Sequence, residues 1–372
     1  MTQNQYTKAL DAAGVSLWLD DLSRNRIESG DLQALIDTKT ITGVTTNPAI
    51  FAKALTNGEA YAAQLSELAA AGADAQTAVV EMTTDDVRAA CDILKPVYEA
   101  TDGYDGRVSI EVDPRLSRDT DQTVAQALEL AQKVGRENVM VKIPGTVEGL
   151  PAISRVLAEG ISVNVTLIFS LPRYREVVNA WLTGLEGARA HGHDLSKIHS
   201  VASFFVSRVD SEIDAQLEAL KLPSQDVQQL RGRAGIANAR LAYRIFEQMQ
   251  DTERWRLLES AGARLQRPLW ASTGTKNPDY SDTRYVNGLV AQYTVNTLPE
   301  DTLNAVADHG EITDSRIPDS YNMDDDHLDD LARAGIDYSE VVTTLEDEGL
   351  EKFVDAWNEL LTKIQQQLDS HK

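Results

Sequence analysis

A lysine interrupts an otherwise apolar run at residues 138–146, whose sequence is NVMVKIPGT. In an extended strand the β-branched residues of this run share one face, and Met140 and Lys142 share the other. If both faces are covered, as in a parallel sheet between helices, the amine of Lys142 is buried. An ammonium away from water is costly, so a buried lysine requires either a charged partner or a chemical role.

Polar residues also lie near the carboxyl ends of other short apolar runs. They are Asp20, Asn47, Ser109, Glu111, Asn164, Thr166, Ser203 and Ser272. Because the carboxyl ends of parallel strands in a barrel meet at one mouth, we expect these residues to converge around Lys142. The set lacks histidine and cysteine and therefore predicts no metal site. A lysine among carboxylates, amides and hydroxyls is typical of covalent amine chemistry on a carbonyl.

The charge state of the amine decides whether it can react. Burial disfavours the ammonium form, whereas carboxylates at Glu111 and Asp20 favour it. One carboxyl must therefore be protonated or separated by a water, and this would also place a general acid beside Lys142. The alternative is a purely structural ion pair between Lys142 and Glu111, which the clustering of polar residues at one mouth disfavours.

The elements that must position these residues alternate along the chain. Eight apolar runs are predicted to be strands, at residues 15–20, 41–46, 107–112, 138–143, 161–166, 198–203, 267–272 and 291–296. Segments of helical period separate them, which indicates an α/β fold with a parallel sheet. Eight strands each followed by helix are what a (β/α)₈ TIM barrel requires, so we predict one barrel domain spanning residues 1–372.

Two helical additions to a plain barrel are expected. Residues 49–106 are too long for a simple connection and predict a helical insertion. Its run at 77–82 continues with an apolar period of three and four, so we interpret that run as helix rather than strand. Residues 308–370 predict an acidic helical extension. Further helices are expected at residues 120–134, 172–190, 226–261 and 339–368.

Composition limits the classes of partner. The 372 residues include 58 acidic and 35 basic ones, for a net charge of -23. An acidic shell argues against nucleic acid or an anionic membrane as a partner, so an anionic substrate needs a local cluster of Lys or Arg. No apolar run is long enough to span a membrane, and the N-terminal segment lacks a signal-peptide core. The single cysteine, Cys91, fits a reducing compartment, and we expect a cytoplasmic protein. No residue pattern decides the oligomeric state.

Six segments together resemble the transaldolase family in its longer bacterial form, within the class I Schiff-base aldolases. They are DDLSR at 20–24, TTNPAIF at 45–51, SIEVDPRLS at 109–117, VKIPGT at 141–146, NVTLIFS at 164–170 and ASTGTKNP at 271–278. The resemblance extends from about residue 15 to residue 310. Each segment alone is weak, but the combination is specific.

The resemblance implies a reaction of the pentose phosphate pathway that needs no metal or organic cofactor. A dihydroxyacetone unit moves from sedoheptulose 7-phosphate to glyceraldehyde 3-phosphate, giving erythrose 4-phosphate and fructose 6-phosphate. Lys142 matches the Schiff-base lysine of the family, and Asp20 matches the acid/base residue that takes the donor hydroxyl proton. Glu111 matches the carboxylate that moves protons through a water. The residues that match the contacts to the three-carbon unit and this water are Asn47, Asn164 and Thr166.

Phosphate binding resembles the family less closely. Ser203 and Arg208 match a serine and an arginine near the phosphate, and Ser272 matches the serine after the seventh strand. Many family members have an arginine where this sequence has Gly274. We expect Lys276 to take its place as a point charge, without the paired hydrogen bonds of arginine.

Two other functions remain open: a Schiff-base aldolase that releases free dihydroxyacetone, and a non-catalytic barrel that binds sugar phosphates. Three other features are expected to be structural. The histidines of HGHDLSKIH, at 191, 193 and 199, are expected in a solvated connection rather than at a metal. The acidic run at 324–330 is expected to open a helix, and Cys91 to be a core residue.

Overall fold

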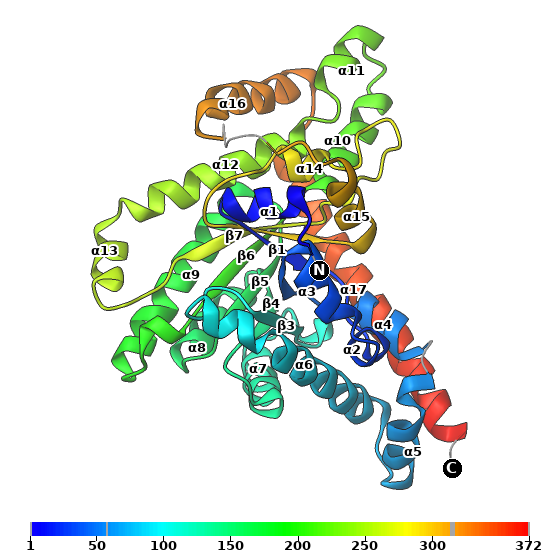
Figure 1. Cartoon of the computed structure of the whole chain (residues 1–372). Helices are drawn as coiled ribbons and strands as arrows, with labels where there is room; N and C mark the ends of the chain where they lie inside the picture. Colours follow the sequence, from blue (N-terminus) through cyan, green and yellow to red (C-terminus); the bar gives the residue numbers. More distant parts are fainter. Residues whose placement is uncertain (1, 57–58, 313–316, 371–372) are drawn as a thin grey trace.

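Eight parallel strands close into a barrel in the order β1 to β8, in a computed structural model that describes residues 2–56, 59–312 and 317–370 (Figure 1). The strands are β1 (Val15–Leu19), β2 (Ile41–Val44), β3 (Arg107–Glu111), β4 (Val139–Pro144), β5 (Val163–Ile168), β6 (Ser200–Phe205), β7 (Gln266–Ala271) and β8 (Thr294–Leu298). All eight predicted strands are confirmed, with ends that differ by at most three residues. The predicted TIM barrel is therefore confirmed.

The two faces of β4 divide as the alternation of residue types predicts. Its β-branched residues belong to a large apolar cluster shared with the surrounding helices. Met140 instead belongs to a second cluster, together with Trp18 of β1 and Leu269 of β7. Glu111 pairs in register with Lys142, and Lys142 pairs with Asn164. Residues that pair in register point to the same side of a parallel sheet, so these three polar side chains form one row inside the barrel.

Helices surround the barrel, and the long connection between β2 and β3 is helical as predicted. The helices are α1 (Gln5–Ala12), α2 (Arg24–Glu28), α3 (Asp31–Lys39), α4 (Pro48–Thr56), α5 (Ala62–Ala70), α6 (Ala75–Ala100), α7 (Thr120–Val134), α8 (Gly149–Ala158), α9 (Leu171–Ala190), α10 (Ser207–Ala219), α11 (Ser224–Leu230), α12 (Ala234–Gln250), α13 (Glu253–Glu259), α14 (Arg284–Asn287), α15 (Glu300–His309), α16 (Ile317–Ala334) and α17 (Tyr338–Ser370). The run at 77–82 lies in α6, and Cys91 of the same helix is buried, so both interpretations are confirmed.

Two helix predictions are wrong. The single helix expected at 226–261 is three helices, α11 to α13. Gly232 has a left-handed backbone, with φ of 66°, between α11 and α12, and the Thr252 side chain caps the start of α13. The acidic run at 324–330 lies in the middle of α16 rather than at its start, because the helix already begins at Ile317. Its Asp324 and His327 side chains are buried, so part of this run faces the protein rather than water.

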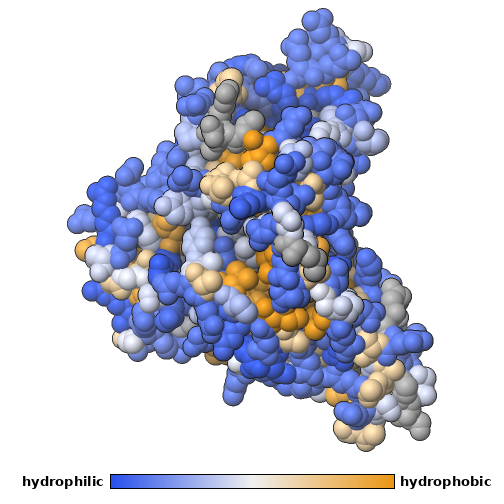
Figure 2. Space-filling model, in the orientation of Figure 1, coloured by the Kyte–Doolittle hydropathy of each residue, from blue (hydrophilic) through white to orange (hydrophobic). Residues whose placement is uncertain are grey.

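The C-terminal helix α17 runs past the barrel and along the insertion (Figure 1). It contacts α4, α5 and α6 of the insertion, and also α10 and β5. Of the described helices, none combines the length and apolar character needed to cross a bilayer. The face shown in Figure 2 is mainly hydrophilic, as the acidic composition leads one to expect. Apolar residues gather near the middle of this face.

Candidate active site

A cavity of about 160 Å³ opens at the carboxyl ends of the strands. Seven of the ten residues predicted from the sequence line it: Asp20, Asn47, Lys142, Ser203, Arg208, Ser272 and Lys276. The other three, Glu111, Asn164 and Thr166, are buried in the barrel on β3 and β5, the two strands that pair with β4 of Lys142. The structure therefore brings the predicted set together at one mouth.

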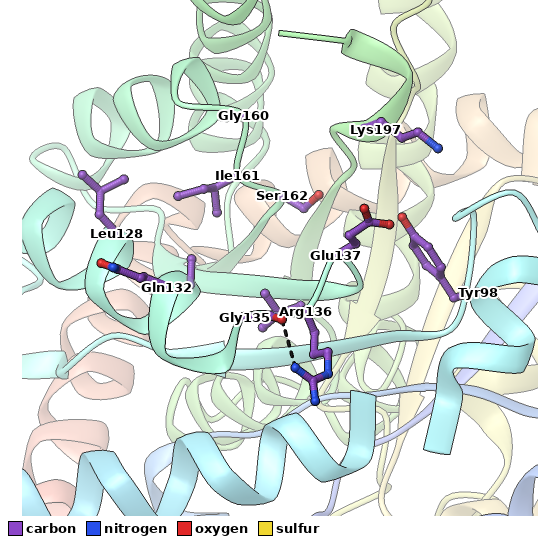
Figure 3. A pocket seen from close by; sticks show the side chains of 12 residues that line it. Tyr98, Leu128, Gln132, Gly135, Arg136, Glu137, Gly160, Ile161, Ser162 and Lys197 are labelled. Atoms are coloured by element: carbon purple, nitrogen blue, oxygen red, sulfur yellow. Dashed lines mark hydrogen bonds between the residues drawn. The ribbon is translucent and has the colours of Figure 1, made fainter. Parts of the chain in front are cut away.

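A larger cavity of about 500 Å³ lies at the opposite end of the barrel (Figure 3). It is lined by residues that precede β4, β5 and β6, among them Glu137, Ser162 and Lys197. Size does not make this cavity the active site, because barrel enzymes place their chemistry at the carboxyl ends of the strands.

Lys142 is buried at the base of the smaller cavity. Its Nζ donates a hydrogen bond to the Thr46 carbonyl at 3.0 Å and lies 3.3 Å from Glu111 Oε2. Neither Glu111 carboxylate oxygen has a well-aligned hydrogen bond within the described part of the chain, and neither has the hydroxyl of Thr166. Lys142 and Glu111 therefore form an ion pair without a well-aligned hydrogen bond, and both carboxylate oxygens can still accept hydrogen bonds.

The protonation of Glu111 is balanced near neutral pH. Burial raises the pKa of its carboxyl to about 7, and the charge of Asp20 acts in the same direction. Lys142 lowers this pKa, but by less than burial raises it. Both protonation states of Glu111 are populated at pH 7, so one carboxyl beside the amine is available as an acid and as a base.

Asp20 directly follows β1 at the edge of the cavity. Its backbone N–H donates to the Leu298 carbonyl at 2.8 Å, which continues the pairing of β1 with β8. Its carboxylate accepts a hydrogen bond from Thr45 Oγ1 at 2.8 Å. Burial raises the pKa of Asp20, against the opposing effects of Lys142, the Thr45 hydroxyl and Lys276. A raised pKa makes this carboxylate a stronger base than an exposed aspartate.

The amides of the site are oriented by their neighbours. Asn164 Nδ2 donates to Ser109 Oγ at 3.0 Å, and Asn164 Oδ1 accepts from Ser203 Oγ at 2.7 Å. These contacts fix which end of the amide faces which strand. Asn47 Oδ1 accepts from the Ile50 backbone N–H at 3.0 Å at the start of α4.

A cationic end of the cavity is built around the start of α10. Arg208 is the second residue of α10, and its guanidinium lies 5.3 Å above the Phe205 ring. Among the described residues, no carboxylate lies within 4.0 Å of this guanidinium, and burial lowers its pKa. Ser207 Oγ and Ser272 Oγ lie 3.0 Å apart beside it. A partly buried guanidinium at a helix N-terminus, with hydroxyls nearby, is a typical anion site.

Lys276 is exposed at the rim of this end. A Cβ atom placed on Gly274 would lie 3.9 Å from Lys276 Nζ, so the ammonium occupies space directly over the glycine. This position is compatible with the expectation that Lys276 supplies the positive charge at this end of the cavity, which stays a prediction.

Comparison with known proteins agrees with this geometry. Residues 17–364 match the model of the family described as Transaldolase/Fructose-6-phosphate aldolase. A transaldolase of Mycolicibacterium smegmatis is 60% identical over 372 residues, which is 100% of both chains. A transaldolase of Mycobacterium tuberculosis is 59% identical over 369 residues, covering 99% of this chain and 98% of the relative. This chain belongs to the transaldolase/fructose-6-phosphate aldolase family.

The cavity of this family member also contains residues that the sequence analysis missed. Phe353 of α17 lies over the amine, with 5.9 Å between its ring centroid and Lys142 Nζ. Thr45 and Thr297 line the same cavity and contact each other through their hydroxyls. Thr45 precedes Asn47 in the motif TTNP and could have been found there. Phe353 gives no local signal, because only the folded chain brings the C-terminal extension over the barrel.

Proposed function

We propose that this chain is a transaldolase that transfers a dihydroxyacetone unit from sedoheptulose 7-phosphate to glyceraldehyde 3-phosphate through an imine on Lys142. Erythrose 4-phosphate is released and fructose 6-phosphate is formed. The observation that carries the proposal is the buried amine of Lys142, which faces the cavity 3.3 Å from a carboxyl whose pKa is raised to about 7.

The first stage is imine formation. Lys142 Nζ adds to the ketone carbon of the donor, and the resulting carbinolamine loses its hydroxyl as water. Protonated Glu111 supplies the proton for the departing hydroxyl, and its ionised form activates the water that later hydrolyses the imine. A water between Glu111 and Thr166 is proposed to carry these protons, because the oxygens of both side chains lack a hydrogen-bond partner among the described residues and buried polar atoms require one.

The second stage breaks and remakes a carbon–carbon bond. Asp20 takes the proton from the donor hydroxyl next to the scissile bond, the aldose phosphate leaves, and the bonding electrons enter the protonated imine to give an enamine. The enamine then attacks the aldehyde carbon of glyceraldehyde 3-phosphate, and Asp20 returns the proton to the new hydroxyl. The raised pKa of Asp20 suits both directions of this proton transfer.

Substrate binding divides between the two ends of the cavity. Asn47 and Asn164 are proposed to hold the three-carbon unit near Lys142. The phosphate is proposed to bind at the cationic end, through the residues Ser203, Arg208, Ser272 and Lys276. Ser203 also donates a hydrogen bond to Asn164 Oδ1 in the structure, so it orients the amide at the three-carbon end of the cavity.

The small cavity favours transfer over release of free dihydroxyacetone. The ring of Phe353 covers the amine, and the cavity has a volume of only about 160 Å³. Water that reached the enamine would protonate it and divert the three-carbon unit to hydrolysis. A coupled assay with and without erythrose 4-phosphate separates the two activities, since a transaldolase releases little ketone without an aldehyde acceptor.

Trapping of the imine is the decisive experiment. Borohydride treatment with fructose 6-phosphate, followed by peptide mass mapping, is expected to place a reduced adduct on the peptide that contains Lys142. Lys142→Met should lose the adduct, whereas Lys197→Met, at the opposite end of the barrel, should retain it. Binding of the sugar phosphate without any adduct would show a non-catalytic binder instead.

The setting of the reaction is proposed from the sequence. We assign it to the pentose phosphate pathway and to the cytoplasm, supported by a single cysteine, Cys91, which is buried in α6. We also propose that residues 1–372 form a single domain. The helical insertion and α17 contact each other and the barrel, which supports one folding unit.

A further inference from the structure

Three potential metal ligands meet on the surface at the loops that follow α8 and α9. One ligand atom each from Glu159, His191 and His193 lies within 4.8 Å of the other two. The sequence analysis considered these histidines with His199 and expected a solvated loop. In the structure His199 is buried and does not belong to this cluster. Glu159, which precedes the histidines by more than 30 residues, takes part instead. We propose that this cluster is a site for one divalent transition-metal ion of the zinc type.

Rigid elements hold the three side chains in place. Glu159 directly follows α8, and His191 directly follows α9. These two helices pack closely on each other. His193 follows Gly192, whose φ of 81° turns the chain back toward α8. A Cβ atom on Gly160 would lie 2.9 Å from His193 Nδ1, so the ring rests directly on the backbone of the loop after α8.

The distances fit a site that closes around an ion by small side-chain movements. His191 Nδ1 lies 3.6 Å from Glu159 Oε1 and donates a hydrogen bond to the Ala158 carbonyl at 3.0 Å, so the ring must turn away from this carbonyl before Nδ1 can bind an ion. Ligand atoms at ~2.0–2.1 Å from a tetrahedral zinc ion lie about 3.4 Å apart. Since all separations in the cluster lie within 4.8 Å, none has to shrink by more than about 1.4 Å. The side chains of His191 and Glu159 are about half exposed and can rotate by this amount.

The ligand types select the class of ion. Two imidazoles and one carboxylate suit zinc and its neighbours in the transition series, whereas calcium and magnesium prefer oxygen ligands alone. The net charge of -23 also favours a cation at the surface. Three protein ligands leave a position for water, and the ion would tie the loop after α8 to the loop after α9.

The site is separate from the proposed chemistry. Gly160, next to Glu159, lines the cavity at the amino ends of the strands, together with Lys197 (Figure 3). Lys142 lines the cavity at the carboxyl ends. We therefore expect the ion to stabilise the fold and to leave the transfer reaction unchanged.

The test uses the full-length chain, without an affinity tag and after treatment with a chelator. Zinc ion is titrated in competition with a chromogenic chelator. We expect saturable binding of one zinc per chain, and a melting temperature higher by about 3 °C at a hundredfold excess over the measured dissociation constant. Glu159→Gln, His191→Ala and His193→Ala should each weaken binding by at least about tenfold.

His309→Ala is the matched control, because His309 is an exposed histidine that contacts two carboxylates, Asp282 and Asp308, without a second imidazole. It should leave the affinity unchanged. Circular dichroism and the transfer assay show that each variant is folded. Absence of saturable binding below about 1 mM, or equal affinity in His193→Ala and the parent, overturns the proposal.

Discussion

Replacing Glu111 with glutamine separates the cost of burying this carboxylate from its use in catalysis. Burial raises the pKa of Glu111 from 4.5 to about 7, in spite of the attraction to Lys142. Below pH 4.5 the carboxyl is protonated in both the folded and the unfolded state, and the protein is most stable with respect to this group. Between pH 4.5 and about 7 the unfolded state releases the proton more readily than the folded state, so the free energy of unfolding falls. The difference between the pKa in the unfolded state and the pKa in the folded state corresponds to about 3 kcal/mol of lost stability at pH 8, because a shift of one pKa unit is worth ~1.36 kcal/mol.

Glutamine matches protonated glutamate in shape and charge, so Glu111→Gln removes the cost that depends on pH. We expect the variant to be more stable than the parent by about 1 kcal/mol at pH 5 and by about 3 kcal/mol at pH 8. Urea unfolding at the two pH values measures this difference. The kcat for transfer should fall by ~10²–10⁴, and the inflection near pH 7 in the parent's profile should disappear.

Glu137→Gln is the matched control, since Glu137 is exposed at the opposite end of the barrel. It should change neither the pH profile nor the dependence of stability on pH. A Glu111→Gln variant that is less stable than the parent at pH 8, or that keeps the inflection near pH 7, refutes the reasoning. The carboxylate would then be a stabilising partner of Lys142, as a purely structural ion pair requires.

Three further substitutions test other parts of the site. Asp20→Asn should still form the borohydride-trapped adduct, while bond cleavage falls by ~10²–10⁴, measured as erythrose 4-phosphate release. Arg208→Ala should raise the KM for fructose 6-phosphate by about 10- to 100-fold, because a hydrogen bond to a charged group contributes ~1.5–3 kcal/mol. The KM for fructose, which has no phosphate, should not change. Phe353→Ala should increase the release of free dihydroxyacetone relative to transfer, and an unchanged ratio would show that the ring does not exclude water.

The barrel could be predicted because its strands carry a clear pattern. In β4 the alternation of β-branched residues with Met140 and Lys142 assigns each face correctly, and the register then brings Glu111, Lys142 and Asn164 into one row. The mouth could be predicted for the same reason, since polar residues at strand ends converge when the strands are parallel. Their catalytic roles remain predictions.

Features that depend on contacts between distant segments could not be predicted. Phe353 reaches Lys142 only because α17 packs against α4 and α10. The apolar period of residues 226–261 continues through Gly232, so the pattern did not reveal that the chain turns there. Likewise, Glu159 meets His191 and His193 only through the packing of α8 on α9.

The barrel interior contains a second buried ion pair, which clarifies the meaning of the first. At the amino ends of the strands, Arg267 lies 3.0 Å from Asp105 and also donates to Ser16 Oγ at 2.7 Å and to the Tyr104 carbonyl at 2.8 Å. Asp105 accepts further hydrogen bonds from Ser16 and from Trp18 at 2.6 Å and 3.1 Å. This pair has the full set of partners that a structural ion pair needs to offset its desolvation.

The pair of Lys142 and Glu111 has no such set. The carboxylate oxygens of Glu111 lack aligned donors among the described residues, and the pKa of the carboxyl is raised to about 7. One fold thus satisfies a buried pair at the amino ends of its strands and leaves another under-satisfied at the carboxyl ends, beside the cavity that Lys142 lines. Under-satisfied polar groups are retained at a cost in stability, so this contrast favours catalysis over structure as the reason for the buried lysine.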